Sequence, residues 1–169
     1  NLSFVHTGPH RTGSDRISEA ASQVMQSLII NIQGDEPLIS PMFISEFAAK
    51  LIKISESSAS SDQVILSSYC SATYDEAIDQ NIVKCFISRN ELGVSFSRHP
   101  ICSPIENSTL CYYKQIGIYG YTKKSLNAFS NLGTSYLEEV EKIELMRWVD
   151  YIGPVRMIRS DYPAYSVDT

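Results

Sequence analysis

A short polar turn after an apolar run contains the side chains best suited to chemistry. Residues 28–32 are almost all apolar, as in a strand buried on both faces of a parallel sheet, and residues 33–37 (Gln-Gly-Asp-Glu-Pro) follow directly. Ligands bind open α/β sheets at the carboxyl ends of the strands, where this turn would lie. Asp35, next to the small Gly34, would suit a Mg²⁺ ion that keeps several waters. Taken alone, such a turn is also typical of a solvated loop.

A second polar segment, residues 10–16 (His-Arg-Thr-Gly-Ser-Asp-Arg), precedes an expected helix. Ser14 or Asp15 is a natural cap for that helix. Backbone amides at a helix N-terminus, small hydroxyls and an arginine suit the polar edges of a nucleotide. An ordinary capped helix with a salt bridge from Asp15 would explain the same residues. The apolar residues that follow at helical spacing are Ile17, Ala20, Ala21, Val24 and Met25.

Two further groups of charged side chains have both a functional and a structural interpretation. Arg98 follows an expected strand, where its guanidinium could pair bidentately with a substrate carboxylate or form a surface ion pair. Glu138, Glu141 and Glu144 lie three residues apart on an expected helix, and Glu144 with Arg147 would form an ion pair on the helix surface. Such a run of charges most often marks a solvated helix face.

Composition disfavours several classes of protein. The 169 residues suit one domain, 43% are hydrophobic, and a net charge of -5 argues against a nucleic-acid binder. Neither the phosphate-loop signature of NTPases nor a G-x-S-x-G elbow occurs. The four cysteines lack C-x-x-C spacing, so we expect reduced, partly buried thiols. No apolar run approaches the roughly 18 residues of a membrane span, and the opening residues do not form a signal peptide.

Helical and extended patterns alternate along the chain, which predicts one α/β domain over residues 1–169, built as a three-layer sandwich. A serine-rich connection is expected at residues 56–62 and a loop at 100–107. Expected strands cover residues 28–32, 64–69, 83–87, 94–97, 116–121 and 155–158. Expected helices start near residues 15, 41 and 74, and a fourth covers residues 137–149.

Several segments, in order along the chain, resemble the 3-deoxy-manno-octulosonate cytidylyltransferases, the CMP-Kdo synthetases. Residues 31–38 (Asn-Ile-Gln-Gly-Asp-Glu-Pro-Leu) resemble that family's signature, and residues 10–16 resemble its H-x-S-G-T-D-R motif with two hydroxyl residues exchanged. The remaining matches are residues 96–101 with F-S-R-x-P-I, 115–121 with H-I-G-I-Y-G-Y, 137–147 with L-E-x-x-E-x-x-E-Q-L-R, and 167–169 with V-D-T. The resemblance runs from about residue 5 to residue 169.

The resemblance implies a reaction, a fold and a set of roles. The anomeric hydroxyl of an eight-carbon acidic sugar would attack the α-phosphate of CTP and release pyrophosphate. The fold would be a mostly parallel, Rossmann-like nucleotidyltransferase sheet. Asp35 and Asp168 would hold a catalytic Mg²⁺, and Arg98 would bind the sugar carboxylate. The residues expected beside the cytidine are Gly13, Ser14, Asp15 and Arg16. Those expected to line the sugar pocket are Gln33, Arg98, Gln115, Tyr119 and Glu144.

The sequence departs from the family pattern in three places. The family's opening strand and glycine-rich triphosphate loop have no counterpart in residues 1–169, so we expect this chain alone to catalyse poorly. Gln115 stands where the family usually has histidine, and Leu145 where it usually has glutamine. Both changes are expected in the sugar pocket, which makes 8-amino-Kdo an alternative substrate to Kdo.

Two more functions are compatible with these motifs: a cytidylyltransferase for sialic-acid-like sugars, and a non-catalytic relative that only binds a sugar or a nucleotide. If the chain is a CMP-Kdo synthetase, the resemblance implies a cytoplasmic homodimer that supplies lipopolysaccharide synthesis and binds neither nucleic acid nor membrane.

Overall fold

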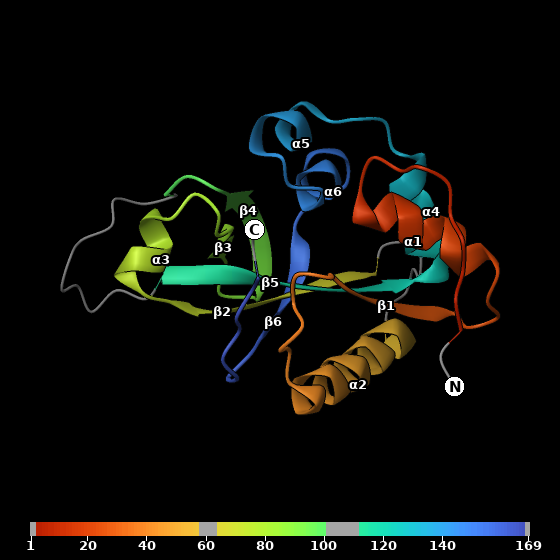
Figure 1. The fold of residues 1–169 in the computed structure, drawn as a ribbon, viewed down its shortest axis with the longest axis horizontal. Coiled ribbons are helices and arrows are strands. Elements are labelled where there is room, and N and C mark those ends of the chain that lie inside the picture. Colours follow the sequence, from red (N-terminus) through yellow and green to blue (C-terminus); the bar gives the residue numbers. More distant parts are fainter. Residues whose placement is uncertain (1–2, 58–63, 101–111, 168–169) are drawn as a thin grey trace.

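A computed structural model describes residues 3–57, 64–100 and 112–167, which form a β-sheet with helices on both faces (Figure 1). No helix in these three stretches is long and apolar enough to cross a membrane. The helices are α1 (Gly13–Ser22), α2 (Pro41–Ser57), α3 (Tyr74–Ile78), α4 (Lys123–Asn131), α5 (Tyr136–Glu141) and α6 (Leu145–Tyr151). The strands are β1 (Leu28–Ile32), β2 (Ile65–Ala72), β3 (Lys84–Ile87), β4 (Leu92–Ser97), β5 (Tyr112–Thr122) and β6 (Val155–Arg159).

The sheet is mixed, so the expectation of a mostly parallel sheet is wrong for the described residues. The strand order is β1-β5-β2-β6-β4-β3, and β2–β6 is the one parallel pairing among these strands. The strand β1 runs antiparallel to β5 and is mostly half-buried rather than buried on both faces. An apolar run shows that a segment is extended and partly buried, but it does not reveal the direction of the neighbouring strand.

Each face of the sheet has its own hydrophobic core. On one face α2 buries Phe43, Phe47 and Leu51 against the strands. On the other, α1, α4 and α6 pack together, and the rings of Phe129 and Trp148 stack with their centroids 6.5 Å apart. Figure 1 shows α2 alone below the sheet and these three helices above it. The two cores fix the sheet from both sides.

All six expected strands are present, but the helices differ from expectation at three points. The helix α4 was not expected because only Leu126 and Phe129 mark its buried face. The single helix expected at residues 137–149 is two helices, since Lys142 adopts a left-handed conformation (φ 57°) that ends α5. Met25 lies beyond the end of α1 and is 98% exposed rather than buried. The expected connection and loop at residues 56–62 and 100–107 fall mostly outside the described residues.

Candidate functional site

The polar turn after β1 is fixed to the neighbouring strand β5. The backbone N–H of Gln33 donates to the Gly117 carbonyl (2.8 Å), and the N–H of Gly117 donates to Glu36 Oε1 (2.9 Å). A β-carbon on Gly117 would lie 3.0 Å from the Glu36 side chain and 3.1 Å from that of Gln33, so glycine permits this close packing. Glu36 is buried, whereas Asp35 is exposed at the rim. The turn therefore presents the Asp35 carboxylate to solvent from a rigid support.

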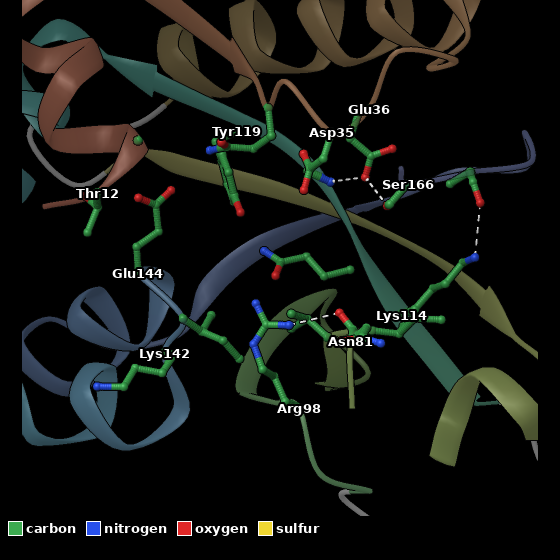
Figure 2. Close-up of a pocket in the computed structure, with 18 of the residues that line it drawn as sticks. Thr12, Asp35, Glu36, Asn81, Arg98, Lys114, Tyr119, Lys142, Glu144 and Ser166 are labelled. Carbon is green, nitrogen blue, oxygen red and sulfur yellow. Dashed lines mark hydrogen bonds between the residues drawn. The ribbon is translucent and has the colours of Figure 1, made fainter. Parts of the chain in front are cut away.

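The segment that follows β6 returns to this turn. The N–H of Val167 donates to the Asp35 carbonyl (2.8 Å), and the Ser166 hydroxyl donates to Glu36 Oε1 (3.0 Å). Lys114 holds the same segment by donating to the Ala164 carbonyl (3.1 Å), as Figure 2 shows. We name residues 164–167 the tail. Asp168, the second expected metal ligand, lies outside the described residues, but its preceding neighbour is bonded to the backbone of Asp35.

The N-terminus of α1 is tied to the start of α6. Thr12 caps α1, two residues before the nearer of the two expected caps, and its hydroxyl oxygen accepts the N–H of Asp15. Glu144 accepts hydrogen bonds from the N–H (3.0 Å) and hydroxyl (2.9 Å) of Ser14. That hydroxyl also lies 2.6 Å from the hydroxyl of Tyr121. Burial raises the pKa of Glu144, although the bonds from Ser14 oppose the shift.

Asp15 is half-buried and takes part in an ionic network with the buried Arg147. Arg147 is 1% exposed and donates to both oxygens of Asp15 (2.8 and 3.2 Å) and to both oxygens of Glu138 (2.8 and 2.6 Å). Arg11 adds a longer bond to Glu138 (3.2 Å). The surface pair expected between Glu144 and Arg147 is therefore wrong, because Arg147 points inward to other carboxylates. The structure of residues 10–16 therefore agrees with their structural interpretation, a capped helix with a salt bridge from Asp15.

Arg98 and Gln115 approach the turn from the other side. The guanidinium of Arg98 donates to the Asn81 carbonyl (2.9 Å), and the Gln115 amide donates to the Ser67 hydroxyl (3.1 Å). Tyr119 is buried, and burial followed by the charge of Glu144 raises its pKa. Figure 2 shows Arg98, Tyr119, Glu144 and Asp35 around one hollow. These groups supply a cation, a neutral hydroxyl and carboxylates on different sides of it.

A pocket of about 830 Å³ collects most of the expected site residues. Such a volume suits a small ligand. The expected residues that line it are Gly13, Gln33, Asp35, Arg98, Gln115, Tyr119 and Glu144. Three expected nucleotide residues are not in its lining: Ser14 is buried behind it, Asp15 faces a neighbouring hollow, and Arg16 is exposed. Leu145, the first residue of α6, is fully buried in the core and is not in the pocket lining, so the expectation that this departure lies in the pocket is wrong.

Sequence reasoning missed several residues that line the pocket. Glu36 is next to Asp35 in the same turn, and this position in the sequence could have identified it as a pocket residue. Lys114 and Asn81 had no motif to mark them, because their roles arise from contacts between segments distant in the chain. The missed polar residues also include Arg11, Thr12, Glu76, Asp79, Lys142 and Ser166.

Comparison with known proteins agrees with the motifs. The cytidylyltransferase family model matches residues 3–158. A 3-deoxy-manno-octulosonate cytidylyltransferase from Wolinella succinogenes is 34% identical, over 95% of this chain and 67% of that protein. One from Leptospira interrogans is 36% identical, over 99% of this chain and 66% of that protein. The chain thus spans about two thirds of the length of these curated relatives.

Solved structures lead to the same group. A CMP:2-keto-3-deoxy-manno-octonic acid synthetase complexed with CTP superposes with a TM-score of 0.80 at 28% identity, over 95% of this chain and 64% of that one. An inositol-1-phosphate CTP transferase from T. maritima, at 17% identity and a TM-score of 0.55 over 93% of this chain and 56% of that one, shares the fold alone. The resemblance found in the motifs is confirmed: the chain belongs to the cytidylyltransferase family, in the group of the 3-deoxy-manno-octulosonate cytidylyltransferases.

Proposed function

We propose that the protein transfers the cytidylyl group of CTP to Kdo, giving CMP-Kdo and pyrophosphate. The observation that carries this proposal is the convergence of Asp35 and the five expected sugar residues on one pocket. Those six residues come from four separate motifs, and the fold had to bring them together.

In the proposed reaction the anomeric oxygen of the sugar forms a bond to the α-phosphorus of CTP. The bond from that phosphorus to the bridging oxygen of the β-phosphate breaks, pyrophosphate leaves with the electron pair, and the proton of the attacking hydroxyl passes to water. Positioning and charge neutralisation contribute most in such transfers. The guanidinium of Arg98 would bind the sugar carboxylate, and Gln33, Gln115 and Tyr119 would bind hydroxyls.

A magnesium ion fits the residues at the turn. Asp35 offers an exposed carboxylate, and Oε2 of Glu36 is buried without a hydrogen-bond partner among the described residues. Carboxylate oxygens are the ligands that Mg²⁺ prefers. Asp35 and Asp168 would hold the ion, with Glu36 positioning the tail that leads to Asp168. When bound, the ion would neutralise phosphate charge and lower the pKa of the attacking hydroxyl.

The nucleotide side of the proposal concerns residues 12–16. Gly13 lines the pocket, while Ser14 and Asp15 hold its wall through Glu144 and Arg147. We propose that residues 1–169 form one three-layer nucleotidyltransferase domain. The protein would act in the cytoplasm as a homodimer, for lipopolysaccharide synthesis.

One observation supports 8-amino-Kdo as the second candidate sugar. Gln115, which replaces the family's usual histidine, lines the pocket and donates to Ser67, which leaves its amide oxygen as an acceptor. Such an oxygen can accept a hydrogen bond from an amine as well as from a hydroxyl.

Pyrophosphate release by the complete protein, with CTP and Mg²⁺, tests the proposal. Release should depend on added sugar, and parallel assays with Kdo and 8-amino-Kdo identify which is preferred. Asp35→Asn should abolish release yet unfold at the same temperature as the unaltered protein, because an exposed carboxylate contributes little stability. Asp150→Asn, an exposed change on α6, is the matched control. Wild-type turnover by Asp35→Asn, or no release with either sugar, would overturn the proposal.

A further inference from the structure

Lys84, a buried residue outside the pocket lining, holds the segments that carry Arg98. Its side chain starts at the first residue of β3 and is 4% exposed. The ammonium donates to three backbone carbonyls, those of Asp79 (2.5 Å), Ile82 (2.7 Å) and Arg98. A lysine ammonium has three N–H donors, so each has a carbonyl partner.

The three carbonyls belong to two separate segments that meet at the pocket wall. Residues 79–82 connect α3 to β3, and Arg98 directly follows β4. The guanidinium of Arg98 returns to the first segment by donating to the Asn81 carbonyl (2.9 Å). Lys84 therefore fixes the backbone of Arg98 and also the segment that receives its guanidinium.

The backbone next to Arg98 is held from a further direction. Ser97, which faces Lys84 in the register of β3 and β4, donates through its hydroxyl to Glu141 of α5 (2.8 Å). The same hydroxyl accepts the N–H of His99 (3.0 Å). Arg98 thus lies between two fixed neighbours, and its guanidinium is directed into the pocket before any ligand arrives.

Burying a charged lysine at this position destabilises the fold unless the ammonium makes hydrogen bonds. Burial lowers the pKa of Lys84, which records the penalty of keeping a charge away from water. An apolar side chain would fill a strand position without that penalty. Unlike an apolar side chain, the ammonium forms hydrogen bonds that connect two irregular segments at the wall of the pocket.

We propose that Lys84 is a positioning residue for the binding of the sugar acid, acting through Arg98. The proposal rests on the proposed function, since it needs Arg98 to bind the sugar carboxylate. A flexible arginine loses rotamer freedom when it binds, whereas one fixed beforehand loses little. Lys84 supplies that pre-organisation without touching the substrate.

A double-mutant cycle in the complete protein tests this role. The variants are Lys84→Met, Arg98→Ala and the two combined, with Lys53→Met on the exposed face of α2 as control. Lys84→Met should raise the KM for the sugar roughly tenfold, in line with weakening one charge-assisted contact. It should leave the KM for CTP unchanged, and it should add nothing in the Arg98→Ala background. Thermal unfolding of each variant shows whether the fold is retained.

The possible results separate the two proposals. If Arg98→Ala leaves the sugar KM unchanged, the role of Arg98 in the proposed function is wrong. If Arg98→Ala raises it but Lys84→Met does not, or if the two effects add, Lys84 does not act through Arg98, and its positioning role fails while that of Arg98 stands. Should Lys84→Met not fold, Lys84→Gln keeps two of the three donors and should give an intermediate sugar KM. An unchanged sugar KM in a folded Lys84→Gln protein would overturn the positioning role.

Discussion

Replacing Arg147 with methionine should unfold the protein at markedly lower denaturant concentration. Methionine keeps most of the aliphatic length of arginine but removes the guanidinium. Four hydrogen bonds to Asp15 and Glu138, of 2.6 to 3.2 Å, would be lost together, and so would the contact of the guanidinium carbon 4.6 Å from the centre of the Phe129 ring. Two carboxylates with little exposure would then lack their main partner.

The size of the effect follows from what each carboxylate retains. Four bonds to charged groups would together account for roughly 6–12 kcal/mol if none were replaced. Asp15 keeps the Thr12 hydroxyl (2.8 Å), and Glu138 keeps Arg11 (3.2 Å), so the loss should be smaller. Removing one partner of a buried ion pair typically costs about 3–5 kcal/mol, which is the range expected here. In a domain of this size that corresponds to a fall in Tm of roughly 6–20 °C.

The pH dependence identifies charge as the cause. Burial acts to raise the pKa of Asp15, but the bonds from Arg147 and Thr12 outweigh it and the pKa lies below its usual range. A lowered folded-state pKa stabilises the protein above the unfolded value of about 3.9 and loses that contribution as the pH falls through the folded value. Without Arg147 burial dominates and the pKa of Asp15 rises, so the variant's deficit should shrink between pH 7 and pH 4.

Urea unfolding followed by tryptophan emission measures these changes. The single tryptophan, Trp148, is buried next to Arg147 and reports on this core. Arg156→Met, at an exposed position on β6, is the matched control and should unfold like the unaltered protein. The triple variant with Asp15→Asn and Glu138→Gln should be more stable than Arg147→Met alone. A deficit below about 1 kcal/mol, or one equal at pH 7 and pH 4, would refute the ionic explanation.

Two further predictions concern packing and thiol reactivity. Gly120→Ala should destabilise the protein by about 1–3 kcal/mol in urea unfolding, because the new β-carbon would lie 2.8 Å from the Phe47 ring. Gly34→Ala is the control, since no atom lies within 4 Å of its new β-carbon. Equal urea midpoints of unfolding for the two variants would contradict the packing argument. Burial raises the pKa of Cys70 to about 11 and also raises that of Cys85. Peptide mass mapping after iodoacetamide treatment at pH 8 should therefore find both thiols unmodified until urea is added, and rapid labelling of either in the folded protein would show that it is exposed.

Elements marked by a clear pattern among neighbouring residues were predictable from the sequence. The turn at residues 33–37 follows β1 as expected, and Asp35 with Gln33 faces the pocket. Local patterns placed the strands because alternation and apolar runs depend on neighbouring residues only. The motifs also identified Arg98, Gln115, Tyr119 and Glu144 as members of one site, which the pocket lining supports.

What the sequence did not reveal depends on contacts between distant segments. The direction of β1 depends on β5, with Ile29 opposite Tyr121, and nothing in residues 28–32 encodes that partner. Arg147 resembled a surface residue because its partner Asp15 lies far away in the chain. The break at Lys142 needs a left-handed backbone without glycine, which sequence patterns rarely signal.

The contacts of the tail also have a consequence for how the protein is synthesised. The turn that contains Asp35 emerges from the ribosome early in synthesis, whereas residues 164–167 emerge only after all six described strands have been made. Until then Asp35 and Glu36 lack the backbone and hydroxyl partners that the tail supplies. A nascent or prematurely terminated chain could form much of the sheet and both cores, yet its pocket would stay open on the side where the tail belongs. A chain that ends before residue 164 would therefore lack the part of the pocket lining that Ala164, Tyr165 and Ser166 supply.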